Sequence, residues 1–419
     1  MKITELTQIL TRYDHQALIQ LYRLRCLSPN QLHEYCYGSK YKNLSDFNEK
    51  VVEKLVHLEV VELVLYQNHQ PALLLTSTGV DVVRELLDLP TNIITSDKKI
   101  IKRGYYRASD LRVLPHFMNH QIHLNEFVLK FKERFETEYP ELPYHYFDEK
   151  HMGSYDLIRP DGMIQLLDMD IFLEMDMNKE SKAQLEGKWS RYRTYFTSQQ
   201  HRYQERQILI LFICEGVDFY ENRSKLVQKT AFGFIGDLFT PEFDMIIGQT
   251  NQLIDLLFSR LIPKWRQSIP PKKQLRYFLE TKKNFQLYRP VQIHQLVGHT
   301  GYELFLKHKS GEETLEFLFD DWRLMNLSIL NTLSLHRKNN GIIARHYKKP
   351  LKYLILIQDE EMVAEWLELS QLLKEPGVCF TTLQRLQQLP LHQAIFVFNE
   401  NKQRYHFKDN QFNRLILEN

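Results

Sequence analysis

Six periodic segments fill the first ninety residues, and their order restricts the fold more than any other feature of the sequence. In three of them apolar residues recur with helical spacing, two β-prone runs around a polar turn predict a hairpin, and a further helical segment follows. Ser28 before Pro29 is a typical N-cap and first helical residue, and we expect Ser45 to cap the third helix. The helices are expected at 14–25, 28–37, 45–58 and 77–89, and the strands at 60–66 and 72–76.

Helix, helix, helix, hairpin, helix is the order of a winged helix-turn-helix, so residues 1–92 are predicted to form such a domain. Its charge does not favour DNA, because residues 1–90 hold nine Lys and Arg against eleven Asp and Glu, a net charge of −2. The third helix offers Lys50 and Lys54 for phosphate contacts, beside three acidic residues. DNA binding is one reading of this domain, and dimerisation or partner binding is the other.

A basic linker is expected at residues 93–112. Its centre carries Lys98, Lys99, Lys102 and Arg103 close to a single acid, Asp97. These four cations are predicted to contact DNA phosphates and to supply the positive charge that the third helix lacks.

Residues 113–265 alternate helical and β-prone segments and predict a central α/β domain. A long amphipathic helix is expected over 114–139, and a second helix over 181–198. Between them short strands are expected at 144–147, 155–158, 163–167 and 170–176. The apolar run 207–214 predicts a buried strand, followed by a helix at 222–230, a strand at 243–247 and a helix at 252–261.

Acidic residues on two of these strands are the strongest indication of chemistry. Asp161 stands at a turn after Pro160, and Glu174 and Asp176 lie two residues apart on an otherwise apolar strand. Alternation along a strand places Glu174 and Asp176 on one face, and pairing of the two strands would bring Asp161 near Glu174. Three carboxylates suit Mg²⁺ or Mn²⁺, which activates water against a phosphodiester. The plainer readings are an ordinary Pro-Asp-Gly turn and a solvated edge strand.

The helix after the acidic strand carries Lys188 and Arg191, which are candidates for holding a phosphate. A solvated helix face is the alternative reading of these cations. Tyr192 and Tyr195 lie on the same helix, and aromatic residues at this spacing are typical of a core rather than of nucleophiles.

A resemblance to a known family rests on four runs of sequence: LLLTSTGVDVV at 73–83, RPDG at 159–162, FLEMDMNKES at 172–181 and LEGKWSRYRTYF at 185–196. Over roughly residues 1–260 the chain resembles replication-relaxation proteins and MobC-type plasmid relaxases, whose catalytic domain is restriction-endonuclease-like. The acidic segment resembles a PD-(D/E)xK core. The resemblance implies that Asp161, Glu174 and Asp176 hold the metal, that Glu126 assists, and that Lys188 stabilises the phosphate. Asp176 stands where that core has its lysine, so Lys188 would supply a migrated cation.

Residues 280–419 predict a C-terminal α/β domain, after a proline-containing basic boundary near residue 270. Strands are expected at 353–358, 378–381 and 394–398, and helices at 360–373 and 382–388. Their order partly repeats that of residues 208–254. A degenerate internal duplication is one reading, and the periodicity that any two βαβα units share is the other. A basic and aromatic cluster offers Arg345, Lys348 and Lys349 to single-stranded DNA, with a solvated basic loop as the alternative.

The expected fold class is therefore α/β, or α+β overall. Residues 1–10 lack the apolar core of a signal peptide, and the strongest apolar run, 208–214, is too short to span a bilayer. Four scattered cysteines fit a reducing compartment, so a cytoplasmic location without a membrane partner is predicted.

The predicted function is that of a plasmid or integrative-element protein that binds an origin of transfer or replication and nicks it with Mg²⁺ or Mn²⁺. Its partners would be the double-stranded origin, the single-stranded product, and a second copy of the chain or other relaxosome proteins. The alternatives are a non-catalytic DNA-binding replication or mobilisation factor with a decayed nuclease core, and a transcriptional regulator.

Overall fold

A computed structural model of the chain has the mixed α/β fold that the sequence predicts. The chain divides into two compact units: unit 1 contains residues 1–154 and 159–163, and unit 2 contains residues 155–158 and 164–419. None of the helices described combines the length and apolar character needed to cross a bilayer. The structure describes residues 2–406 apart from 90–92, 95–99, 103–105, 151–156, 199–205, 217–219, 240–242, 266–270, 298–301, 303, 311–312, 324–326, 350, 359, 361–362, 364–376 and 399–403.

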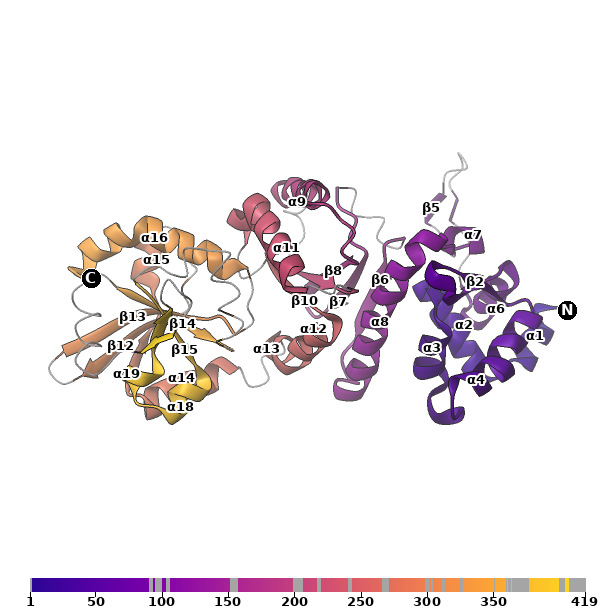
Figure 1. Cartoon of the computed structure of the whole chain (residues 1–419), viewed down its shortest axis with the longest axis horizontal. Helices are drawn as coiled ribbons and strands as arrows, with labels where there is room; N and C mark the ends of the chain where they lie inside the picture. The colour runs from indigo at the N-terminus through magenta and orange to yellow at the C-terminus, as the bar shows by residue number, and fades with distance from the viewer. Residues whose placement is uncertain are drawn as a thin grey trace. The chain divides into compact units, whose positions relative to one another are not determined.

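After α1, which the sequence did not predict, unit 1 has the predicted succession of helices and a hairpin, with the short strand β1 added between α2 and α3 (Figure 1). Strands β2 and β3 pair antiparallel, and β1 pairs with the other side of β3, giving the order β1-β3-β2. The elements are α1 (Ile3–Ile9), α2 (Arg12–Leu24), β1 (Cys26–Leu27), α3 (Pro29–Leu32) with η1 (His33–Tyr37) and η2 (Gly38–Lys40), α4 (Leu44–Phe47) with η3 (Asn48–Val52) and α5 (Glu53–His57), β2 (Val61–Leu65), η4 (Gln67–His69), β3 (Pro71–Leu75) and α6 (Ser77–Leu87).

Side-chain caps set where these helices start. Ser28 caps α3 as predicted, because its hydroxyl accepts a hydrogen bond from the Gln31 amide at 3.1 Å. The expectation that Ser45 caps the third helix is wrong. Asn43 is the cap, since its Oδ1 accepts from the Asp46 amide at 2.9 Å, and Ser45 lies inside α4.

Helix α8 (Pro115–Glu138) packs on the three-stranded sheet of unit 1. The apolar cluster between them contains Cys26, Ala72, Leu74, Val113, Met118 and Ile122. Helix α8 therefore shares a core with the N-terminal three-stranded sheet, although its sequence pattern predicted a place in the central domain. Unit 1 also contains β4 (Ile93–Ile94), β5 (Ile100–Lys102), α7 (Ala108–Leu111) and β6 (Tyr144–Asp148).

Unit 2 opens with a sheet in which β7, β8, β9 and β10 are neighbours in that order, and in which β8, β9 and β10 run parallel. Helices α9 and α11 lie on one face of this sheet and α12 on the other (Figure 1). Leu157 and Ile158 lie outside any strand, so the strand expected at 155–158 is not formed there. The elements are β7 (Gly162–Leu166), which starts in unit 1, β8 (Met169–Asp176), α9 (Lys182–Thr197), β9 (Gln207–Cys214), α11 (Tyr220–Ile235), η5 (Gly236–Leu238), β10 (Phe243–Gly248), α12 (Thr250–Leu256), η6 (Leu257–Leu261) and α13 (Ile262–Trp265).

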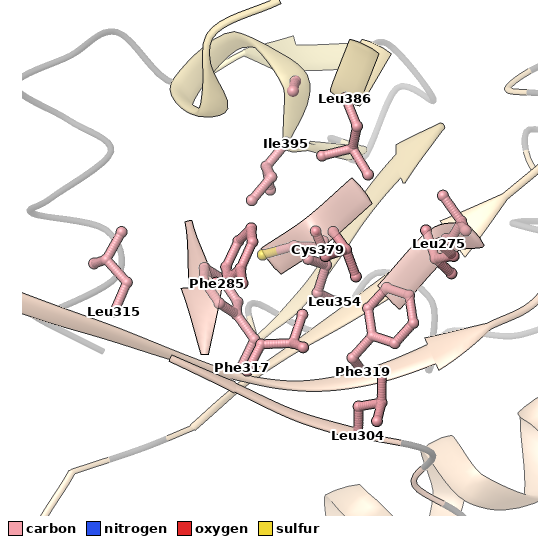
Figure 2. Close-up of a cluster of buried hydrophobic side chains, with 14 residues drawn as sticks. Leu275, Phe285, Leu304, Leu315, Phe317, Phe319, Leu354, Cys379, Leu386 and Ile395 are labelled. Carbon is pink, nitrogen blue, oxygen red and sulfur yellow. The ribbon is translucent and has the colours of Figure 1, made fainter. Parts of the chain in front are cut away.

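The second sheet of unit 2 has seven strands in chain order, β11 to β17. Figure 2 shows the apolar cluster on one of its faces, where Phe285, Phe317, Phe319, Leu354 and Cys379 gather. The elements are α14 (Pro271–Lys282), β11 (Phe285–Tyr288), α15 (Val291–Val297), β12 (Leu304–Ser310), β13 (Glu313–Asp321), α16 (Ser328–Tyr347), β14 (Lys352–Ile357), β15 (Val378–Thr382), α18 (Leu383–Gln388), α19 (Leu391–Ala394), β16 (Phe396–Phe398) and β17 (Arg404–His406). Most of the helix expected at 360–373 lies outside the described residues.

The two sheets of unit 2 share an order of elements. In each, four neighbouring strands follow one another (β7 to β10, and β12 to β15), and the last three of each set run parallel. A helix, α9 or α16, follows the second strand of each set, and a helix, α12 or α18, follows the fourth. The duplication suggested by the sequence thus has a counterpart in strand order, while common descent of the halves stays a prediction.

A polar contact joins β10 of the first sheet to α16, the helix that follows β13 of the second sheet. The Asp244 carboxylate on β10 accepts hydrogen bonds from the Ser328 amide at 3.2 Å and the Ser328 hydroxyl at 2.6 Å, at the start of α16. The neighbouring Leu327 amide donates to the Met245 carbonyl at 3.2 Å.

Candidate functional site

The acidic strand β8 is fully buried, although it carries charged side chains. Its eight residues, 169–176, all lie in the interior, between the neighbouring strands β7 and β9. Glu174 and Asp176 both contact the layer formed by α9 and α11, as the alternation along the strand predicts. Their side chains are only 2% and 1% exposed, so each carboxylate needs compensation from protein groups.

Glu174 is compensated by two residues of helix α9. Lys188 Nζ donates to Oε2 at 2.8 Å, and the Tyr192 hydroxyl donates to Oε1 at 2.5 Å. Lys188 also lies 3.1 Å from Glu180 and 5.4 Å from the centre of the Phe212 ring. The cation predicted from the sequence therefore pairs directly with the predicted acid, next to the apolar ring of Phe212.

Asp176 is held by a different cation. Arg223 Nε of α11 donates to its Oδ2, and the Asn178 amide donates to Oδ1 at 2.9 Å. Arg223 also donates to the Glu180 carbonyl at 2.8 Å. Arg223 Nη2 and Glu180 Oε2 are buried without a hydrogen-bond partner among the residues described, which leaves a donor and an acceptor for a water molecule or a polar ligand.

The other two predicted metal ligands lie in unit 1 and have partners there. Asp161 Oδ2 is 3.2 Å from His120 Nε2 of α8. Glu126 accepts hydrogen bonds from the Tyr35 hydroxyl at 2.8 Å and from Gln31 Nε2 at 3.0 Å. Within the described part of the chain, no group of three or more His, Cys, Asp or Glu side chains is arranged to hold a metal ion.

The tyrosines on α9 pack in the core. Tyr195 has no exposed surface and Tyr192 is 2% exposed. Trp189 precedes both in the chain, and the centre of its ring lies 5.8 Å from that of Tyr192 and 5.7 Å from that of Phe212. This burial agrees with the sequence-based expectation that these rings belong to a core.

A buried polar cluster in unit 1 was not predicted from the sequence. Arg25, which ends α2 with a left-handed φ of 72°, places Nη1 3.4 Å from Asp148, 2.9 Å from Glu149 and 3.3 Å from Gln121. Burial raises the pKa of Asp148 to about 6, although Arg25 acts in the opposite direction. The signal available in the sequence was Gln121 and Asn125, two amide side chains one helical turn apart on the apolar face of α8.

The basic residues predicted to bind DNA have different settings. Lys50 is 60% exposed and pairs with Asp46 at 2.5 Å, whereas Lys54 donates to the buried Asp14 at 2.6 Å. Arg191 is exposed on α9. Lys98, Lys99 and Arg103 lie outside the described residues, Lys102 ends β5, Arg345 and Lys348 are exposed at the end of α16, and Lys349 pairs with Glu316 at 3.1 Å.

Residues 18–209 of the chain match the model of the replication-relaxation family. The matched range starts in α2 and ends in β9, so it includes both the helical part of unit 1 and the acidic strand with α9. Comparison with curated proteins and with solved structures gave no match.

Proposed function

We propose that the chain is a DNA-binding factor for the replication or mobilisation of a plasmid or integrative element, and that its acidic segment stabilises the fold without cutting DNA. The observation that carries the DNA function is the match of residues 18–209 to the replication-relaxation family. This range contains both the helices and hairpin of unit 1, whose order is that of a winged helix, and the acidic strand β8.

The non-catalytic part of the proposal rests on how the carboxylates are compensated. Glu174 has a lysine and a tyrosine hydroxyl on its two oxygens, and Asp176 has an arginine and a backbone amide. A divalent ion would have to displace these donors in a place where the acids are at most 2% exposed. Paired buried charges of this kind are typical of a structural network.

Contact with duplex DNA is proposed through the third helical segment, α4 to α5, and the basic stretch around Lys102. Lys50 is the better placed of the two predicted contacts, because its pair with Asp46 is exposed and easily exchanged for a phosphate. Lys54 is committed to the buried Asp14, so it contributes to the fold first. The same helices would serve a second copy of the chain if dimerisation is their role.

Metal-dependent nicking is the second candidate function, and one observation favours it. Lys188 Nζ lies 2.8 Å from Glu174, which is where a migrated lysine of a PD-(D/E)xK-like core would act. In this reading Asp161, Glu174 and Asp176 would hold Mg²⁺ or Mn²⁺ with help from Glu126. The ion would supply a bound hydroxide and neutralise phosphate charge.

Incubation of the full chain with supercoiled plasmid DNA, with Mg²⁺ or Mn²⁺, separates the two candidates. A DNA-binding factor retards the plasmid in a gel and yields no open-circle product. Glu174→Gln, which keeps an acceptor for Tyr192, should bind as the unaltered chain does.

Glu136→Gln is the matched control, because Glu136 is an exposed acid of α8 that pairs with Lys132. Open-circle product that disappears in both Asp161→Ala and Glu174→Gln, but persists in Glu136→Gln, would establish the nicking function and refute the non-catalytic one. Failure to retard any plasmid would refute the proposed DNA binding.

A further inference from the structure

An aromatic and basic surface lies on the second sheet of unit 2, on the face opposite the apolar core. Alternation along β12 turns Leu304 and Leu306 into the core shown in Figure 2 and turns Phe305 and Lys307 to the other face. On the edge strand β11, Tyr288 is directly opposite Phe305. We define the aromatic–basic surface as Tyr288, Phe305, Lys307, Arg345, Tyr347, Lys348 and Lys349.

Three neighbouring rings belong to this region, of which Phe305 is buried, at 6% exposed, and Tyr347 is half-buried. The ring centres of Tyr288 and Phe305 are 6.4 Å apart, and those of Phe305 and Tyr347 are 5.6 Å apart. Tyr288 at the outer end is 45% exposed. Its hydroxyl makes a hydrogen bond only to Gln286 on the same strand, at 3.0 Å, among the described residues. Nearly half of the surface of Tyr288 is thus exposed on strand β11.

Cations lie among the rings and around them. Lys307 Nζ is 5.3 Å from the centre of Phe305 and 5.7 Å from the centre of Tyr288. Glu316 is 9% exposed and holds Lys307 at 2.8 Å and Lys349 at 3.1 Å. Burial acts to raise the pKa of Glu316, but hydrogen bonds from these two lysines outweigh it and the pKa is lowered, so the anion persists. With Arg345 and Lys348 exposed beside them, cations exceed acids on this surface.

This chemistry matches a strand of nucleic acid whose bases are unpaired. An exposed tyrosine ring such as that of Tyr288 can stack on the face of an unpaired base, and ammonium and guanidinium groups nearby can bind the phosphates of the same strand. A duplex hides its base faces, so it would meet the cations without using the rings. We propose that the aromatic–basic surface binds single-stranded DNA, with a base stacked on Tyr288 and phosphates held by the exposed Arg345 and Lys348.

The proposal deepens the proposed DNA function, because it assigns the single-stranded form to a particular face of the chain. The test uses a fluorescent oligo(dT) of about 20 nucleotides, longer than the span of one binding fold, and measures its anisotropy with the full chain. Loss of one stacked base corresponds to about a tenfold weaker affinity, so Tyr288→Ala should raise the Kd about tenfold. Tyr288→Phe keeps the ring and should bind as the unaltered chain does. Arg345→Gln should reduce the slope of log Kd against log salt concentration by about 0.7.

Tyr277→Ala is the matched control, because Tyr277 is a 67% exposed tyrosine on α14, which packs on the opposite face of the sheet. Equal affinity of the Tyr288→Ala variant and the unaltered chain, or equal losses in the Tyr277→Ala and Tyr288→Ala variants, would overturn the proposal. Plasmid retardation without oligo(dT) binding would overturn this inference and leave the proposed function standing. Oligo(dT) binding that depends on Tyr288, without plasmid retardation, would support this inference and refute the proposed binding of duplex DNA.

Discussion

Replacing Lys188 by Met should destabilise unit 2 strongly, because it removes the cation from a buried carboxylate. Glu174 is 2% exposed and Lys188 is 13% exposed, so water cannot replace the lost ammonium without opening the sheet–helix interface. Removing one partner of a buried ion pair costs about 3–5 kcal/mol. Tyr192 still donates to Glu174 in the variant, so we expect the lower end, about 3 kcal/mol. Urea unfolding followed by the fluorescence of the buried Trp189 next to Lys188 reports on this region.

The double variant Lys188→Met with Glu174→Gln tests the reasoning further. It removes both charges and should recover most of the loss, to within about 1 kcal/mol of the unaltered chain. Lys182→Met is the control on the same helix, since Lys182 is 65% exposed and its pair with Glu186 should contribute nothing measurable. A loss below about 1 kcal/mol for Lys188→Met would place the pair among surface ion pairs and refute the structural role of the acidic segment.

Two further predictions concern unit 1. Burial raises the pKa of Asp148 from 3.8 to about 6, so the native state holds a proton that the unfolded chain has lost, and stability should fall as pH rises from about 4 to about 6. Asp148→Asn should remove up to about 3 kcal/mol of this pH dependence in urea unfolding, and an unchanged slope would contradict burial of Asp148 as its cause. Lys54→Met should destabilise the unit by about 2 kcal/mol, because the buried Asp14 loses a charged donor, whereas Lys50→Met should leave the melting temperature unchanged. Equal losses of stability in the two lysine variants would show that the Lys54–Asp14 pair stabilises unit 1 no more than the Lys50–Asp46 pair does.

The elements that could be predicted are those whose pattern is local. The long helix α8 and the strands β8 and β9 have strong periodicity or unbroken apolar runs, and their observed bounds differ from the expected ones by a residue at most. No element was predicted between residues 277 and 352, where β11, β12, β13 and α16 lie. Strand β12 begins with three apolar residues in a row, because Phe305 on its outward face is apolar, so polar and apolar residues do not alternate there. Helix α16 carries Gly341 and several polar residues that weaken its helical pattern.

The candidate site was predictable only in part, for the same reason. The acids and Lys188 lie within one stretch of sequence, so their meeting follows from a strand and the next helix. Arg223 reaches Asp176 from 47 residues away, and Arg25 reaches Asp148 from 123 residues away. Such pairs depend on packing between distant segments, which no local pattern encodes.

The contact between Asp244 and Ser328 has a consequence for how the chain can be divided. The residue that precedes α16, Leu327, has no side chain able to accept from the first amides of the helix, and Asp244 of β10 accepts from the first of them, that of Ser328. A fragment ending near residue 265 would lose the two Ser328 donors of the buried Asp244 carboxylate and keep the Met245 amide as a donor at 2.8 Å, and the complementary fragment would lose Asp244 as an acceptor at the start of α16. The two halves of unit 2 should therefore be expressed and purified together, because each lacks a group that the other supplies.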